Sequence, residues 1–323
     1  MNNILLEVRN LRTYFHVKEG VAKAVDGVSF KLRQGETLGL VGESGCGKTV
    51  SSLSILKLLD VPPAEYRDGQ IIFEGQDLLK SGEKEMRRVR GKTISMIFQE
   101  PMTSLNPVMS IGFQIKEVLL THRKMRPASA RDRAVELLDM VGIPSPQARL
   151  GEYPHQLSGG MRQRVMIAMA LACKPKVLIA DEPTTALDVT IQAQILDLMN
   201  QLQADLGASI LLITHDLGVI AETADRVAVM YAGRIVEEAD VKTIFKNPVH
   251  YYTQGLLDSI PRIDEEQRPQ RLSEIPGRVP NLCFLPPGCA FYDRCPVGID
   301  QCRAERPKLQ SVDEGHLVSC WKA

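Results

Sequence analysis

The sequence has no net charge, and it lacks the segments that would carry a chain into or across a membrane. Its 323 residues include 39 basic and 39 acidic side chains, which cancel. Because a zero total gives no overall field to recruit nucleic acid or anionic lipid, we expect no nucleic-acid partner. The N-terminus, MNNILLEVRN, has no basic segment followed by an apolar one, and the longest apolar run, Val165–Cys173, is far shorter than the ~20 residues of a membrane-spanning helix. These absences predict a cytosolic protein that meets a membrane only through partners.

The cysteines lack closely spaced pairs. Five of the seven lie within the last 41 residues, at positions Cys283, Cys289, Cys295, Cys302 and Cys320. In a reducing compartment such a group binds metal more often than it forms disulfides. Structural zinc sites usually contain at least one pair spaced by ~2–4 residues, and none is present here. An iron–sulfur cluster, a zinc site and free thiols therefore all stay open, and the neighbouring Arg294 and Arg303 could offset the negative charge of a cluster.

A phosphate-binding pattern, G-x4-GK-[ST], stands between an apolar strand and a helix expected over Val50–Leu59. Glycines let successive backbone N–H groups turn around a β-phosphate, and the N-terminus of the helix adds a favourable dipole. Lys48 would neutralise charge on the β- and γ-phosphates, and the Thr49 hydroxyl would bind Mg²⁺. The residues of this loop expected to contact a nucleotide are Gly42, Ser44, Gly45, Cys46, Gly47, Lys48, Thr49 and Val50.

Three more apolar runs end at residues suited to nucleotide chemistry. VLIADEP closes on Asp181, the expected Mg²⁺ carboxylate, and on Glu182, the expected general base for the attacking water. SILLITHD closes on His215, which would hydrogen-bond a γ-phosphate or hold the water. Gln99 follows the run ISMIF, and its amide could reach the metal or the water. Ligands of open α/β sheets bind beyond the carboxyl ends of the strands, so we expect these groups to converge.

The segment LSGGMRQR, residues 157–164, predicts a second helix start that attracts an anion. Ser158 suits the N-cap, and two glycines leave backbone N–H groups bare. One triphosphate is not easily wrapped by two such helix ends of the same compact lobe. A second chain docked head to tail would present this step to the γ-phosphate held by the first. The alternative is an ordinary N-cap without a ligand.

In their order along residues 1–246, these elements resemble the ATP-binding subunit of an ABC transporter. The quoted elements are the loop at 42–49, Gln99, LSGG, ADEP, ALD at 186–188 and His215. The resemblance implies an α/β P-loop NTPase core with an antiparallel β subdomain. It also implies a helical subdomain, inserted over about 101–165, that contacts the membrane subunits.

The same resemblance assigns further residue roles. Phe15, or its neighbour Tyr14, would stack on the adenine. Asp188 would lie at the dimer interface, and the residues acting on the partner's nucleotide would be Ser158, Gly159 and Gly160. Met161 stands where the family usually has Gln, a change that leaves the glycine N–H groups intact.

The last part of the chain, residues 247–323, resembles the C-terminal extension of ATPases from peptide- and nickel-type importers. The resemblance rests on NPVHYYTQGLLDSIP (247–261) and IPGRVPNL (275–282), with Tyr251 in place of the usual proline. Dipeptide-importer ATPases with such an extension carry a [4Fe–4S] cluster. The resemblance therefore favours a cluster held by Cys289, Cys295, Cys302 and Cys320, because a cube needs four thiolates.

Together these features predict an ATP-hydrolysing subunit on the cytoplasmic face of the membrane that powers import of di- or oligopeptides. Its expected partners are a second related ATPase, two permeases and an extracytoplasmic binding protein. Nickel and glutathione importers remain alternatives. A soluble ABC ATPase acting on DNA or the ribosome is an alternative of another class, but the sequence has neither heptads nor a second phosphate loop. An iron–sulfur sensor that binds nucleotide with negligible hydrolysis is the third hypothesis.

Overall fold

The computed structural model describes residues 3–100, 104–184, 188–260 and 274–323. The chain divides into two compact units. The first contains residues 80–213 together with 33–36 and the extreme N-terminus. The second contains residues 4–32, 37–79 and 214–323. Each unit therefore combines segments that are far apart in the sequence.

The first unit contains three neighbouring parallel strands, β6 (Ile94–Ile97), β7 (Val177–Asp181) and β8 (Ser209–Thr214). All residues of β7 and β8 are buried, as expected for short apolar runs within a parallel sheet. Ile97 pairs with Ala180, and Asp181 pairs with Ile213, so the carboxyl ends of neighbouring strands lie level with each other.

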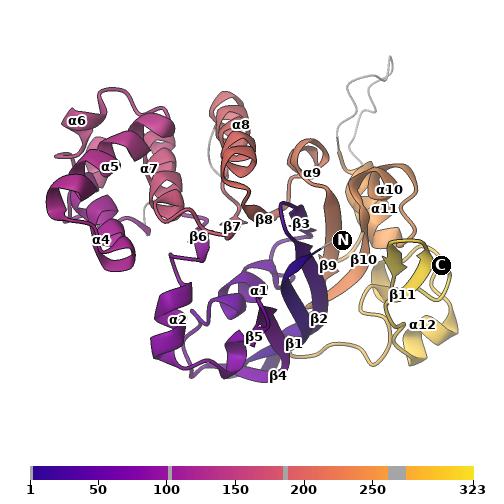
Figure 1. Ribbon diagram of the computed structural model, residues 1–323. Coiled ribbons are helices and arrows are strands. Elements are labelled where there is room, and N and C mark those ends of the chain that lie inside the picture. Colours follow the sequence, from indigo (N-terminus) through magenta and orange to yellow (C-terminus); the bar gives the residue numbers. More distant parts are fainter. Residues whose placement is uncertain (1–2, 101–103, 185–187, 261–273) are drawn as a thin grey trace, which may run out of the picture. The chain divides into compact units, whose positions relative to one another are not determined.

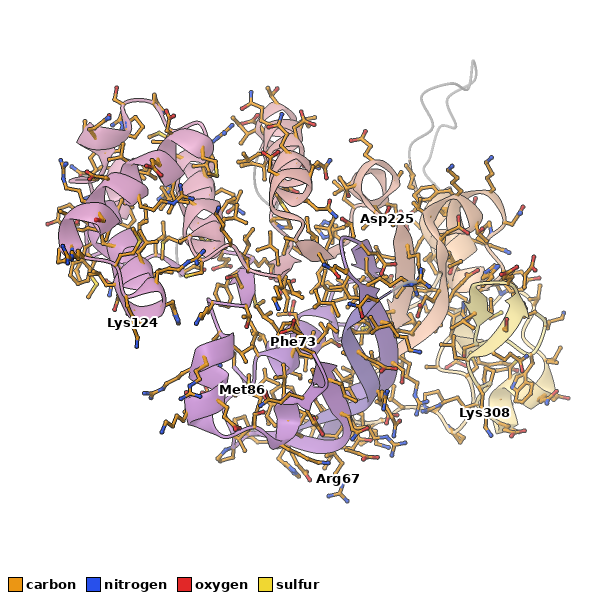
Figure 2. The ribbon with its side chains drawn as sticks, viewed as in Figure 1. Arg67, Phe73, Met86, Lys124, Asp225 and Lys308 are labelled. Carbon is orange, nitrogen blue, oxygen red and sulfur yellow. The ribbon has the colours of Figure 1, made fainter. Side chains whose placement is uncertain are left out.

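Helices make up most of the remaining first unit. Their bounds are α2 Glu83–Val89, α4 Ile111–Arg123, α5 Pro127–Met140, α6 Pro146–Arg149, η2 Pro154–Gln156, α7 Gly159–Leu171 and α8 Val189–Leu206. Helices α4, α5 and α7 contact one another and form a helical group (Figure 1). Ser110 caps the start of α4, and Lys124 ends it in a left-handed conformation. Figure 2 labels Lys124 at this end of the helix. The prediction of a mostly helical stretch near 101–165 agrees with these bounds, although 101–103 lie outside the described residues.

Two groups of strands and five helices form the described second unit. An antiparallel group has the order β2 (Gly20–Arg33), β1 (Ile4–Val17), β4 (Ala64–Phe73) and β5 (Gln76–Asp77). The other has the order β11 (Gln310–Asp313), β12 (His316–Val318), β10 (Arg234–Asp240), β9 (Arg226–Tyr231) and β3 (Thr37–Val41). The helices are α1 Lys48–Ile55, α9 Leu217–Thr223, α10 Val241–Lys246, α11 Tyr251–Asp258 and α12 Asp300–Ala304. Short 3-10 turns are η1 Leu78–Lys80, at the junction with the first unit, and η3 Tyr292–Arg294.

Helix α1 differs from the helix predicted over Val50–Leu59. It begins at Lys48, within the glycine loop itself, and ends at Ile55. Lys57 adopts a positive φ of 49°, which an α-helix does not accommodate. The prediction placed the end too late because the apolar pattern continues past the residue where the backbone turns.

The C-terminal segment, which we define as residues 274–323, joins the second unit through the sheet. Strand β12 pairs antiparallel with β10, and β11 pairs with β12. Buried Phe291 adds a packing contact, since its ring lies edge-on to Tyr231 with the centroids 5.3 Å apart. Along the described ranges, no helix is both long and apolar enough to cross a lipid bilayer.

Candidate functional site

The glycine loop lies between β3 and α1 in the second unit. Strand β3 is fully buried, and helix α1 begins directly after Gly47, whose φ of 106° favours glycine. A Cβ atom on Gly47 would lie 2.2 Å from the carbonyl oxygen of Ala24. A Cβ on Gly42 would similarly lie 2.1 Å from the carbonyl oxygen of Met230. The surrounding backbone therefore presses against the loop and fixes its path.

Lys48 holds the loop from within. Its side chain is 5 % exposed, and its ammonium donates hydrogen bonds to the carbonyl oxygens of Gly42 (2.7 Å) and Glu43 (3.2 Å). Ser44, Gly45 and Thr49 are exposed, whereas Cys46 is buried. This arrangement leaves the exposed rim of the loop accessible to a phosphate, next to a buried positive charge.

The carboxyl ends of β6 and β7 bring Gln99 and Glu182 together in the first unit. The Gln99 amide nitrogen donates a 2.9 Å hydrogen bond to the Glu182 carboxylate. Glu182 adopts a positive φ of 47°, an uncommon conformation for a residue with a side chain, and its backbone N–H donates to the carbonyl of Ile213. Asp181, directly before it, is 1 % exposed. Strained backbone of this kind is concentrated at functional sites, where the surrounding structure holds it in place.

Two helix starts face a common hollow in the first unit. Ser158 accepts a hydrogen bond from the backbone N–H of Met161 and caps α7, as predicted. Asp188 caps α8 by accepting from the N–H of Ile191, although 186–187 of the ALD motif lie outside the described residues. The hollow has a volume of about 560 Å³ and is lined by Gly142, Ser158, Gly159, Gly160, Met161, Arg164, Asp188, Ile191 and Gln194. The sequence-predicted SGG step and Asp188 are thus neighbours.

Tyr14 and Phe15 are consecutive residues of β1, so their side chains point to opposite faces of the strand. Only one of them can therefore face a given ligand. The Tyr14 hydroxyl donates a 2.8 Å hydrogen bond to Asp26, and burial together with this bond raises the pKa of Tyr14 to about 12. Phe15 is half-buried, opposite Ala64 of β4. His215 is exposed and follows β8 directly, before Asp216, the N-cap of α9.

Four of the five C-terminal cysteines converge on one small cavity of about 20 Å³ in the second unit. The cavity is lined by Cys289, Cys295, Cys302, Cys320, His250, Tyr251, Phe291, Tyr292, Pro307 and Trp321. Burial raises the pKa of the Cys289 thiol to about 11 and also raises that of Cys320. Cys283 is half-buried and is not part of this lining. Among the residues that the structure describes, no group of three or more His, Cys, Asp or Glu side chains has the arrangement that holds a metal ion.

Some residues that contact the phosphate loop carry no signal in the sequence. Arg294, considered above only as a neighbour of the cysteines, pairs with Glu43 of the loop at 2.6 Å. The Tyr252 hydroxyl accepts a hydrogen bond from the backbone N–H of Glu43. These partners are more than 200 residues from Glu43 along the chain, so neither spacing nor periodicity could have predicted the contacts.

Two protein-family models match the chain. The model described as "ABC transporter" matches residues 25–185, and the model described as "Oligopeptide/dipeptide transporter, C-terminal region" matches residues 236–302. The first match includes the glycine loop, Gln99, the SGG step and Glu182. The second includes the cavity residues Cys289, Cys295 and Cys302.

Curated relatives match over almost the whole chain. The chain is 53% identical over 322 residues to the probable peptide ABC transporter ATP-binding protein y4tR of Sinorhizobium fredii, covering 99% of this chain and 96% of that protein. It is 56% identical to the oligopeptide transport ATP-binding protein AppD of Bacillus subtilis, covering 98% and 96%. It is 52% identical to the dipeptide transport ATP-binding protein DppD of the same organism, covering 98% and 94%.

Solved structures show the same fold. A dimeric, post-hydrolysis state of the ATP-binding cassette MJ0796 with bound ADP and phosphate matches with a TM-score of 0.66 at 26% identity, over 73% of this chain and 98% of that one. The cbiO1 protein of Clostridium perfringens, part of an ABC transporter complex, matches with a TM-score of 0.63 at 27% identity, over 76% and 92%. The α/β P-loop fold of an ABC ATPase, expected from the sequence, is thereby confirmed. The chain belongs to the family of ATP-hydrolysing, ATP-binding subunits of peptide ABC transporters.

Proposed function

We propose that this chain is the ATPase that powers import of di- or oligopeptides through a membrane ABC transporter. The observation that carries the proposal is the near full-length identity of 52–56% to relatives named as peptide, oligopeptide and dipeptide transport ATP-binding proteins. The C-terminal match to the oligopeptide/dipeptide transporter family adds independent support, because it lies outside the ABC transporter match. Nickel and glutathione are the alternative cargoes.

In the proposed ATP site, the phosphate loop binds the β- and γ-phosphates. Backbone N–H groups of residues 44–49 surround the phosphates, Lys48 supplies positive charge and Phe15 stacks on the adenine. Thr49, Gln99 and Asp181 would hold the Mg²⁺, which would neutralise phosphate charge when bound. This proposal draws support from the exposed rim of the loop and from the hydrogen bond between Gln99 and the Glu182 carboxylate.

Glu182 is the proposed general base. The Gln99 amide holds its carboxylate at 2.9 Å and thereby sets its direction, so that it can orient a water in line with the γ-phosphate. His215 would hydrogen-bond the γ-phosphate or the same water. The strained backbone at Glu182, with its N–H fixed on Ile213, supports a role that depends on an accurately placed carboxylate.

A second ATPase subunit completes the proposed site. The hollow beside Ser158–Gly160 and Asp188 would receive the γ-phosphate held by the partner's phosphate loop, at the N-terminus of α7. Two related cassettes would close on ATP and reopen after hydrolysis. Residues 1–246 would form this ATPase domain and 247–323 an extension. Two permeases, contacted through the helical group near 101–165, and an extracytoplasmic binding protein would complete the transporter, with this chain peripheral on the cytoplasmic face of the membrane.

The cysteine cavity is proposed to hold a [4Fe–4S] cluster. Cys289, Cys295, Cys302 and Cys320 line one cavity and Cys283 does not, so the lining supplies the number of thiolates that a cube requires. The described side chains do not already have a metal-holding arrangement, so the thiols would have to rearrange to admit the cluster. The cluster binds thiolates, so each cysteine must lose its proton when the cluster binds. Burial raises the pKa of Cys289 and thereby favours the thiol, so cluster binding must supply the free energy of this deprotonation. The aromatic lining would shield the cluster from water. The competing assignments are zinc and free thiols.

The ATPase role predicts the behaviour of a Glu182→Gln variant in cells where this chain is the only source of the subunit. Glutamine keeps the size of the side chain and a hydrogen-bonding oxygen but removes the base, so hydrolysis by the assembled transporter should fall by ~10²- to 10⁴-fold. ATP binding should persist, and uptake of labelled dipeptide should stop. Phosphate release from membrane vesicles and peptide uptake measure the two effects.

The matched control is Glu222→Gln, which makes the same chemical change at an exposed position of α9 and should leave hydrolysis and uptake unchanged. Continued hydrolysis in the Glu182→Gln transporter would refute the assigned base. Uptake of nickel or glutathione in place of peptides would refute the proposed cargo and leave the ATPase role intact. Recovery of the purified chain with ribosomes or DNA, rather than with membrane proteins, would refute the transporter role.

A further inference from the structure

One buried guanidinium links the C-terminal segment to the phosphate loop. Arg294 lies at the end of the 3-10 turn η3, directly before Cys295, and its side chain is only 4 % exposed. Its two terminal nitrogens donate to the two carboxylate oxygens of Glu43, at 2.6 and 3.0 Å. Glu43 is the second residue of the phosphate loop, and both residues belong to the second unit. The contact is therefore a bidentate ion pair, the arrangement that best fixes a carboxylate in direction.

The rest of the guanidinium is fixed as well. It donates to the carbonyl oxygens of Pro276 at 2.9 Å and Ile275 at 3.3 Å. It also lies 5.8 Å from the ring centres of both Tyr231 and Phe291. Because these contacts leave the Arg294 side chain little rotational freedom, the ion pair fixes the position of the Glu43 carboxylate.

Glu43 is held at its backbone too. Its N–H donates a 2.8 Å hydrogen bond to the hydroxyl of Tyr252, a fully buried residue of α11. Its carbonyl oxygen accepts from Lys48 at 3.2 Å. The N–H, the carbonyl and the side chain of Glu43 are thus all occupied, and two of these three contacts come from residues beyond 246.

These contacts have two consequences for nucleotide binding. The orientation of the peptide units at Glu43 determines where the following N–H groups of the loop point, and a loop already ordered loses less entropy when it binds phosphate. The Glu43 carboxylate would otherwise stand as a negative charge beside the triphosphate, and Arg294 neutralises it. We propose that Arg294 is a positioning residue through which the C-terminal segment presets the phosphate loop for nucleotide, with Tyr252 as its backbone counterpart. The proposal requires no occupant of the cysteine cavity.

The test measures the dissociation constant of a fluorescent ATP analogue on the full-length chain, in the native protein and in four variants. Arg294→Gln should weaken binding about tenfold, within the usual range for coupled sites. Arg294→Lys should recover part of the loss, because lysine keeps the charge but not the paired geometry. Glu43→Gln should recover most of the loss in the Arg294→Gln background, because it removes the unpaired carboxylate. Lys308→Gln, which removes an exposed cation of the same segment, should change the constant less than twofold (Figure 2).

A merely structural role would give a different pattern. If the C-terminal segment only stabilised the fold, Arg294→Gln would lower the unfolding midpoint while the folded fraction bound the analogue normally, and the proposal would be overturned. A double variant that binds the analogue no better than Arg294→Gln alone would overturn it as well. If Arg294→Gln does not fold, Arg294→Lys carries the test, with at least a threefold loss expected and unchanged affinity as the refuting result.

Discussion

Gly45 and Gly47, two of the three positive-φ glycines of the phosphate loop, differ in what surrounds them, and this difference yields a controlled prediction. Gly45 has a φ of 79°, and nothing lies within 4 Å of the position where its Cβ would be. Gly47 has a φ of 106°, and its Cβ would lie 2.2 Å from the Ala24 carbonyl oxygen and 2.7 Å from the Met230 side chain. Alanine at Gly45 therefore adds backbone strain alone, whereas alanine at Gly47 adds strain and a collision with backbone.

The two costs can be assigned magnitudes. A left-handed conformation costs an L-residue about 1–2 kcal/mol, which is the loss in unfolding free energy expected for Gly45→Ala. Forcing additional atoms into a packed site costs about a further 1–3 kcal/mol, so Gly47→Ala should lose about 2–5 kcal/mol. That is a large share of the ~5–15 kcal/mol that stabilises a typical domain.

Urea unfolding followed by circular dichroism measures both losses, provided that the slopes of the two transitions agree. Titration with a fluorescent ATP analogue should show a clear loss of binding for Gly47→Ala, because the collision between the new Cβ atom and the Ala24 carbonyl can be relieved only if the loop moves. Equal unfolding midpoints for the two variants would refute the reasoning, since the contact with Ala24 would then impose no constraint. Native ATP affinity in Gly47→Ala would refute it as well.

Two further predictions concern the second unit. For the proposed cluster, Cys302→Ser should sharply lower the iron content, the sulfide content and the absorbance near ~400 nm of the anaerobically purified chain. The control Cys283→Ser should leave these three quantities unchanged, because Cys283 does not line the cavity. Stoichiometric zinc in the native chain would contradict the cluster. For Asp26, burial would raise the pKa, but hydrogen bonds from Arg234 and Tyr14 outweigh it and hold the pKa below its ordinary value. A carboxyl group whose pKa is lowered in the folded state stabilises the fold above its unfolded pKa, and this stabilisation is lost as pH falls through the folded pKa. Asp26→Asn should therefore lower the free energy of unfolding most near neutral pH, and the difference from the native chain should shrink below about pH 4 in a series of urea titrations. A difference that does not change with pH would contradict this assignment.

Features set by consecutive residues were predictable from the sequence. The glycine loop between strand and helix, the cap at Ser158 and the buried strands ending at Asp181 and Thr214 all appear in the structure. Each depends on local backbone preference and hydrogen bonds within a few residues, which the order of side chains specifies directly. The helix predicted to end at Leu59 shows the limit of such reasoning, because an apolar pattern does not reveal a single left-handed residue such as Lys57.

The partners of these local features were decided by the tertiary structure. The Gln99–Glu182 contact joins residues 83 apart because parallel β6 and β7 end level with each other. The Arg294–Glu43 pair joins residues 251 apart, and four cysteines of irregular spacing meet in one cavity. Sequence spacing carries no information about such contacts, because their closeness results from strand order and chain crossings rather than from neighbouring residues. The sequence alone determined which groups could bind a nucleotide, and the tertiary structure determined which distant side chains hold them in place.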